Sequence, residues 1–99
     1  MTEIRNIKDL ELLLNENKIF DKLGIDSIGV FGSFARGEKA NDIDLLLENV
    51  KDKKQIIEIK ESLEDKTDRK IDIVFDDFAN PIILHRAKKE LVHVKKYQE

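Results

Sequence analysis

The sequence predicts an α/β (α+β) fold in which a small mixed sheet of about three strands is flanked by helices. Helical and strand-like apolar patterns alternate along the 99 residues. A charged fraction of 39% with a single proline favours long solvated helices over a loop-rich fold. There is no cysteine, which excludes disulfides and zinc–thiolate sites. We expect one domain over residues 1–99, since this length supports a single hydrophobic core.

The first helix is expected at residues 7–20, where apolar side chains recur near helical spacing. Asn6 can cap its start, and Gly24 can end it. The next apolar run, at residues 27–31, is rich in β-prone residues and is broken by Gly32-Ser33. We therefore expect the first strand to end at a glycine–serine turn.

The remaining elements complete an alternating pattern. They are a helical turn at 34–37, a strand at 42–47, a helix at 52–64, a strand at 70–75, a helix from Asn80-Pro81 to Leu91 and a short extended piece at 92–94. A helical connection favours parallel pairing of the second and third strands. The short link between the first two strands permits antiparallel pairing.

Charge and hydropathy limit the partners. The net charge of −3 disfavours an extended nucleic-acid footprint, and no run approaches the roughly 20 apolar residues of a membrane span. Residues 1–5 lack the apolar run of a signal peptide, so we expect a cytoplasmic location. Residues 85–99 carry five basic and two acidic side chains, which suit a solvated helix face, or else contact with phosphates or an acidic partner.

Three aspartates lie within apolar strands. Asp42 and Asp44 are two residues apart and share one strand face, and Asp72 is central in the next strand. Carboxylates in such strands lose hydration and repel one another, so they need a compensating cation, and Mg²⁺ suits hard oxygen ligands. The alternative for each residue alone is a solvated position on a one-sided sheet. Because Leu46 shares their face, that face is not simply the wet side.

The glycine–serine turn is a weaker signal. Gly32 permits close approach of a ligand to the backbone, and Ser33 with nearby N–H groups can hold phosphate oxygens. Arg36 could reach the same phosphate or face solvent. Taken alone, a glycine–serine dipeptide is more often an ordinary turn than a phosphate contact. The Walker and dinucleotide-binding patterns are absent.

Taken together, these segments resemble a known family. Gly32-Ser33-Phe34-Ala35-Arg36-Gly37, Asp42-Ile43-Asp44-Leu45 and Lys70-Ile71-Asp72-Ile73-Val74 are similar to motifs of the nucleotidyltransferase superfamily that includes DNA polymerase beta. The match is closest to its minimal nucleotidyltransferase branch. Asn41 departs from the serine that usually precedes the first aspartate in that branch. The resemblance implies the nucleotidyltransferase fold.

The resemblance also implies roles for these residues. Gly32 and Ser33 would hold the terminal phosphates of ATP, with Arg36 as a secondary phosphate contact. Asp42 and Asp44 would ligate two Mg²⁺ ions. Asp72 would ligate one ion and accept the proton of the attacking hydroxyl. The implied reaction transfers AMP from ATP and releases pyrophosphate.

Members of the minimal branch resemble antitoxins that pair with a HEPN-domain ribonuclease toxin. The implied acceptor is a tyrosine of that toxin, which adenylylation silences. An alternative is a non-catalytic antitoxin that neutralises its partner by binding alone. A nucleic-acid-modifying subunit is disfavoured by the net negative charge.

Some aromatic and imidazole side chains admit a functional or a structural interpretation. No second ligand lies at metal spacing from either histidine, so we expect His85 on a helix face and His93 in a surface strand. The phenylalanines are expected in the core, with Phe34 or Phe78 as the one exposed near the cleft.

Overall fold

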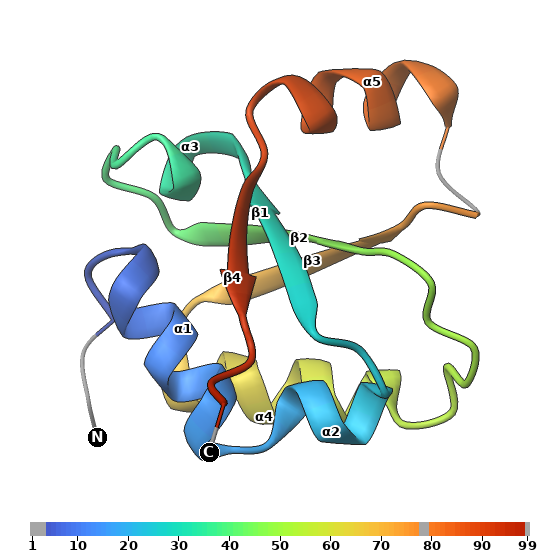
Figure 1. The fold of residues 1–99 in the computed structure, drawn as a ribbon. Coiled ribbons are helices and arrows are strands. Elements are labelled where there is room, and N and C mark those ends of the chain that lie inside the picture. The colour runs from blue at the N-terminus through green and yellow to red at the C-terminus, as the bar shows by residue number, and fades with distance from the viewer. Residues whose placement is uncertain (1–3, 78–79, 99) are drawn as a thin grey trace.

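Nine helices and strands are seen in the computed structural model, which describes residues 4–77 and 80–98. In chain order they are α1 (Ile7–Glu16), α2 (Ile19–Leu23), β1 (Ser27–Phe31), α3 (Gly32–Ala35), β2 (Asp42–Leu47), α4 (Ile56–Thr67), β3 (Lys70–Phe75), α5 (Pro81–Lys89) and β4 (Val92–Lys95) (Figure 1). The three strands predicted from the apolar runs are confirmed at both ends. The predicted mixed α/β class is confirmed as well.

The sheet is mixed, with strand order β3-β2-β1-β4. β2 and β3 are parallel, and β1 is antiparallel to both β2 and β4. The predicted pairings of the first three strands are therefore confirmed. The expected size was one strand too small, because the extended piece at the end of the chain pairs with β1 over Ser27 to Val30.

The helices differ from the sequence patterns at their ends. The single helix expected at 7–20 is two helices, since Lys18 is left-handed (φ 55°) and the Asn17 side chain donates to the Leu13 carbonyl. α4 begins at Ile56 rather than Asp52, whose carboxylate instead accepts from the Lys54 N–H in a turn. No helix in the described part of the chain has the length and apolarity needed to cross a membrane.

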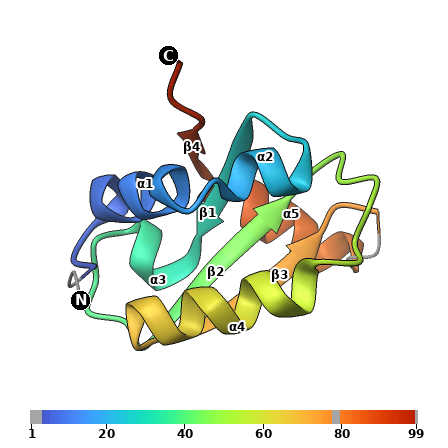
Figure 2. The ribbon, with the colours of Figure 1, turned by 90° about the horizontal axis from the view of Figure 1, so that it is seen from below.

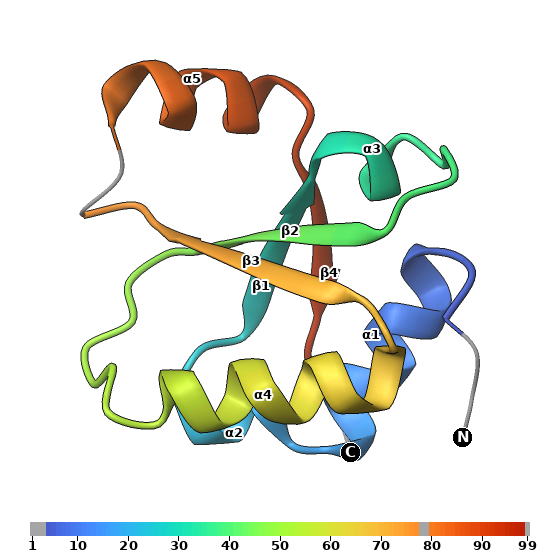
Figure 3. The ribbon, with the colours of Figure 1, turned by 180° about the vertical axis from the view of Figure 1, so that it is seen from behind.

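More helices lie on one face of the sheet than on the other. Figures 1 and 3 show α1, α2 and α4 together below the sheet and α5 above it. Figure 2, from below, has the three helices in front of the sheet and α5 behind it. Alternate residues of β2, namely Ile43, Leu45 and Leu47, are buried in the core beneath those helices. The other face of β2 carries the aspartates, so these side chains lie on the side of the sheet that α5 covers.

Candidate functional site

The turn after β1 depends on glycine at its first position. Phe31 is extended, Gly32 has φ 76°, and α3 begins at once, two residues earlier than the expected helical turn. A Cβ atom built on Gly32 would collide with the Oδ2 atom of Asp44. The left-handed backbone and this contact both require glycine. Phe31 is the N-cap residue of α3 and makes no side-chain hydrogen bond to it, so the first N–H groups of this helix have no side-chain cap.

The strand register brings two of the three predicted carboxylates side by side. Asp44 of β2 is directly opposite Asp72 of β3 on one side and Phe31 of β1 on the other. Asp42 is exposed and is opposite Lys70 in the strand register, while Asp44 is half-buried. The sheet therefore places Asp44 between the end of β1 and Asp72, with Asp42 at its outer edge.

Asp44 is the carboxyl whose pKa this arrangement raises. Burial raises the pKa of its carboxyl, and the charges of Asp72 and Asp42 and hydrogen bonding with Asp72 raise it further. Lys70 opposes this shift only partly. Its Nζ lies 3.7 Å from the Asp72 Oδ1 atom, and both side chains are well exposed. The group of carboxylates is thus undercompensated, which favours a cation beside Asp44.

The donor set suits Mg²⁺ in chemistry. Within residues 4–77 and 80–98, no three acidic or histidine side chains enclose an ion site by themselves. Mg²⁺ commonly binds one or two carboxylates and completes its shell with water and substrate phosphates. Asp44 and Asp72 can supply two such carboxylates beside the Gly32 turn, and Asp42 is the third candidate. The three-aspartate metal site remains a prediction.

Arg36 is held next to the glycine–serine turn by two acidic residues. Its Nη2 donates to the Ser33 Oγ at 3.3 Å, and its Nη1 donates to both carboxylate oxygens of Glu90 at 2.8 Å. Its Nε pairs with Glu38, and the pKa of the guanidinium is raised by Glu38 first and by Glu90 as well. Nη2 consequently remains directed at Ser33, where a phosphate contact is predicted.

A cavity of about 440 Å³ adjoins this turn. It is lined by Phe31 and Gly32 from the end of β1 and by Ile83, Arg86, Ala87, Lys89 and Glu90 from α5 and its C-terminal cap. The cavity therefore borders Gly32, one of the predicted phosphate contacts, and its far wall is α5.

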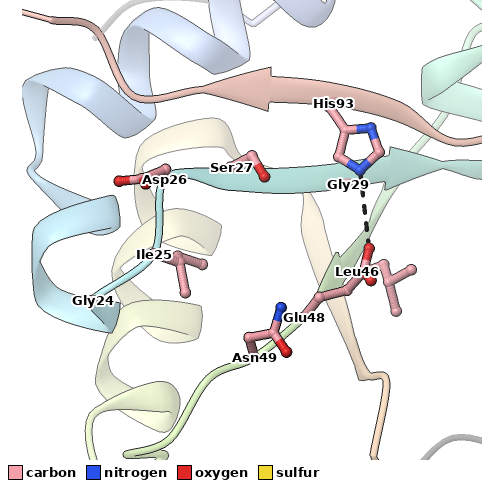
Figure 4. A pocket seen from close by; sticks show the side chains of 9 residues that line it. All are labelled: Gly24, Ile25, Asp26, Ser27, Gly29, Leu46, Glu48, Asn49 and His93. Atoms are coloured by element: carbon pink, nitrogen blue, oxygen red, sulfur yellow. Dashed lines mark ion pairs between the residues drawn. The ribbon is translucent and has the colours of Figure 1, made fainter.

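A second cavity, of about 360 Å³, lies at the other end of β1 and contains none of the predicted site residues. Figure 4 shows the His93 ring directed at the Glu48 carboxylate, with Ser27 and Asn49 beside them. Nε2 of His93 is 3.9 Å from Glu48 Oε1. His93 lies on β4 and His85 is exposed on α5, as predicted.

The structure adds residues that the motifs did not indicate. Arg69 donates to the carbonyls of Ala40 (3.1 Å) and Ile4 (2.6 Å) and lies over the Phe34 ring, so it fixes the loop that leads into Asp42. Phe34 is buried at 3% exposure, so it is not the phenylalanine exposed near the cleft in the expected pair of Phe34 or Phe78. Phe78 is outside the described residues. Strand alternation could have indicated Lys70, which shares a face with Asp72, but nothing in the sequence links Glu90 to Arg36.

The glycine turn beside two carboxylates on a mixed sheet fits the nucleotidyltransferase class that the motifs predicted. A family model described as "Polymerase beta, Nucleotidyltransferase" matches residues 11–99, and the chain belongs to this family.

Relatives and solved structures agree with this membership. A candidate protein adenylyltransferase from Methanocaldococcus jannaschii is 34% identical over 95% of this chain and 100% of its own length. Protein adenylyltransferase MntA from Thermococcus cleftensis is 30% identical over 89% of this chain and 95% of its own length. A crystal structure of a mutant MntA–HpeT toxin–antitoxin matches with a TM-score of 0.64 and 25% identity, covering 86% of this chain and 75% of that one. A toxin–antitoxin crystal structure with AMP-PNP matches with a TM-score of 0.63 and 26% identity, covering 86% and 76%.

Proposed function

We propose that residues 1–99 form one Mg²⁺-dependent protein adenylyltransferase domain that acts in the cytoplasm as an antitoxin. It transfers AMP from ATP to a hydroxyl, specifically a tyrosine, of a partner HEPN-domain toxin. The observation that carries the proposal is the close approach of Gly32 to Asp44, which is opposite Asp72 in the sheet. The names of the adenylyltransferase relatives and the AMP-PNP in a similar toxin–antitoxin structure support the proposal.

The phosphates of ATP bind at the start of α3 in this proposal. The N–H groups of Gly32 and Ser33 and the Ser33 hydroxyl contact the terminal phosphates. Arg36 adds a charge-assisted hydrogen bond to the phosphate through Nη2. Nη1 pairs with Glu90, so Nη2 remains directed at Ser33. The adjoining cavity gives the nucleotide room between this turn and α5.

Transfer is a displacement at the α-phosphorus of ATP. The acceptor hydroxyl oxygen forms a bond to that phosphorus, and the bond from phosphorus to the bridging oxygen of pyrophosphate breaks. The hydroxyl proton passes to the Asp72 carboxylate, which is partly exposed and can receive it from a docked protein. Bound Mg²⁺ supplies charge neutralisation of the phosphates. The products are an adenylylated protein and pyrophosphate.

Labelled ATP tests the proposal directly. The pure protein is incubated with Mg²⁺, α-labelled ATP and the protein encoded by its genomic neighbour, and the label on the neighbour is followed. We expect labelling that is lost in Asp44→Asn and in EDTA. If Asp44→Asn no longer labels the neighbour but still neutralises its toxicity, neutralisation occurs by binding alone.

Ligand-induced stabilisation gives an independent measurement. Mg²⁺ with ATP at about 100 times the dissociation constant stabilises the folded state by about 2.7 kcal/mol. We expect this rise in melting temperature for the wild type and its loss in Asp42→Ala/Asp44→Ala. Absence of both labelling and Mg²⁺-dependent ATP binding would contradict the enzyme proposal.

A further inference from the structure

One exposed face of α5 combines apolar and basic side chains. Ile82 and Ile83 are 66% and 51% exposed, and Arg86 and Lys89 are exposed beyond them along the helix. Ile82, Arg86 and Lys89 are spaced one helical turn apart, so they lie on one side of the helix, and Ile83 borders that side. We call these four residues the α5 face. Of the α5 residues, only Ala87 is buried, so the helix packs on the sheet by a narrow strip.

The charges of the α5 face are available to a partner. Within residues 4–77 and 80–98, Arg86 and Lys89 take part in no ion pair. Isoleucines flanked by unpaired cations complement a surface that offers apolar side chains together with carboxylates. Two of these four residues, Arg86 and Lys89, belong to the basic segment 85–99. From the sequence, the basic side chains of this segment could face solvent, a phosphate or an acidic partner.

The position of the α5 face relates it to the reaction. Ile83, Arg86 and Lys89 also line the cavity that Phe31 and Gly32 close on the other side. A protein that lies on the α5 face is therefore at the rim of the proposed nucleotide site. The exposed Ile57 of α4, by contrast, belongs to the helical layer on the opposite side of the sheet (Figures 1 and 3).

We propose that the α5 face is the docking surface for the acceptor protein of the proposed adenylyl transfer. The occupant is the segment next to the acceptor hydroxyl, with apolar side chains that cover Ile82 and Ile83 and carboxylates that pair with Arg86 and Lys89. Docking there presents the hydroxyl across the cavity rim towards the Gly32 turn and Asp44. The inference rests on the proposed function and names where its substrate protein binds.

The test compares two exposed positions on opposite layers. Ile82→Asp/Ile83→Asp removes the apolar contact and adds like charge to an acidic partner, while Ile57→Asp, at a residue 67% exposed, is the matched control. Affinity for the purified genomic neighbour is measured by calorimetry, and ATP–Mg²⁺ binding by the shift in melting temperature. We expect the double variant to weaken the neighbour's binding by about 30-fold or more, as loss of a central contact does. Ile57→Asp is expected to keep wild-type affinity for the neighbour. Ile82→Asp alone, at a residue that does not line the cavity, is expected to keep the wild-type ATP shift.

Charge reversal tests the second part of the surface. Arg86→Glu/Lys89→Glu is expected to slow association with the neighbour about ten-fold and to remove much of its salt dependence. Ile82→Ser/Ile83→Ser, which adds no charge, separates lost apolar contact from repulsion and is expected to weaken binding as well.

Four outcomes overturn the docking proposal. The first is unchanged affinity for the neighbour in the α5 variants, and the second is an equal loss of affinity in Ile57→Asp. The third is loss of the ATP shift in Ile82→Asp, which would assign the face to the nucleotide, and the fourth is failure of the wild type to bind the neighbour. Failure of the proposed function is distinguishable from these: the wild type would bind the neighbour through the α5 face without labelling it.

Discussion

Replacing Gly32 with alanine probes the contact on which the site depends. Two other glycines, Gly24 and Gly37, also have positive φ values, of 69° and 78°, and a Cβ on either would meet nothing within 4 Å. All three alanine variants therefore share the backbone strain, and only Gly32→Ala adds a collision with the Asp44 carboxylate. The difference between the variants isolates that collision.

The expected costs follow from these two effects. Alanine in the left-handed region costs about 1–2 kcal/mol, which applies to Gly37→Ala and Gly24→Ala. Turning the Asp44 side chain away from the new methyl group adds about 1 kcal/mol, the cost of an unfavourable rotamer. For a domain of this size each kcal/mol lowers the melting temperature by about 4–8 °C. Gly32→Ala should therefore melt about 4–8 °C below Gly37→Ala.

Thermal unfolding by circular dichroism in metal-free buffer measures this difference. Asp44→Ala removes the carboxylate that the methyl group meets, so the Gly32→Ala/Asp44→Ala double variant should recover about 1 kcal/mol relative to the sum of the single changes. Equal melting of Gly32→Ala and Gly37→Ala, together with additive single changes, would refute the close approach of the Gly32 backbone to Asp44. The glycine–serine turn and the carboxylates would then not form one joined site.

Three further predictions concern neighbouring residues. The raised pKa of Asp44 means that the folded state holds its proton more tightly than the unfolded chain, so stability falls as pH rises above about pH 4. Asp44→Asn should therefore raise the melting temperature at neutral pH in EDTA, and should not raise it below about pH 4. Equal melting temperatures of the wild type and Asp44→Asn at neutral pH would contradict this. Glu90→Gln loosens Arg36 at an exposed ion pair and should weaken ATP binding up to about five-fold by calorimetry, with unchanged affinity as the contrary result. Arg69→Ala removes two charged hydrogen bonds and should lower the free energy of unfolding by about 2–3 kcal/mol in urea, whereas a loss below about 1 kcal/mol would assign Arg69 little role.

Local patterns were sufficient for β1, β2 and β3 and for the starts of α1 and α5. Residues 42–47 and 70–75 read as strands because their apolar residues need no tertiary information to be recognised. The caps at Asn6 and Asn80 accept hydrogen bonds from Asp9 N–H and Ile82 N–H, as the sequence predicted. The break between α1 and α2 was missed because it depends on Asn17 and Lys18, and no proline or glycine marks it.

Long-range contacts explain most of what the sequence did not predict about the sheet and the site. The fourth strand exists because residues 92–95 find β1 as a partner, and four residues with a mixed pattern carry little signal of their own. Arg36 could be recognised as a candidate phosphate contact from its place in the motif. Its fixation by Glu90, 54 residues away, required the fold.

The end of the chain connects the phosphate site to the proposed docking face. Leu91 lies against Gly29 so closely that a Cβ on this glycine would collide with it, which seats the end of α5 on β1. Glu90, one residue earlier, holds Arg36, and the following residues pair with β1 as β4. A partner that binds the α5 face therefore presses on the same short segment that orients Arg36 beside Ser33. A partner that holds this segment in place also holds Arg36 beside Ser33, so ATP should bind more tightly to the docked complex than to the free chain. Glu90→Gln should reduce that gain.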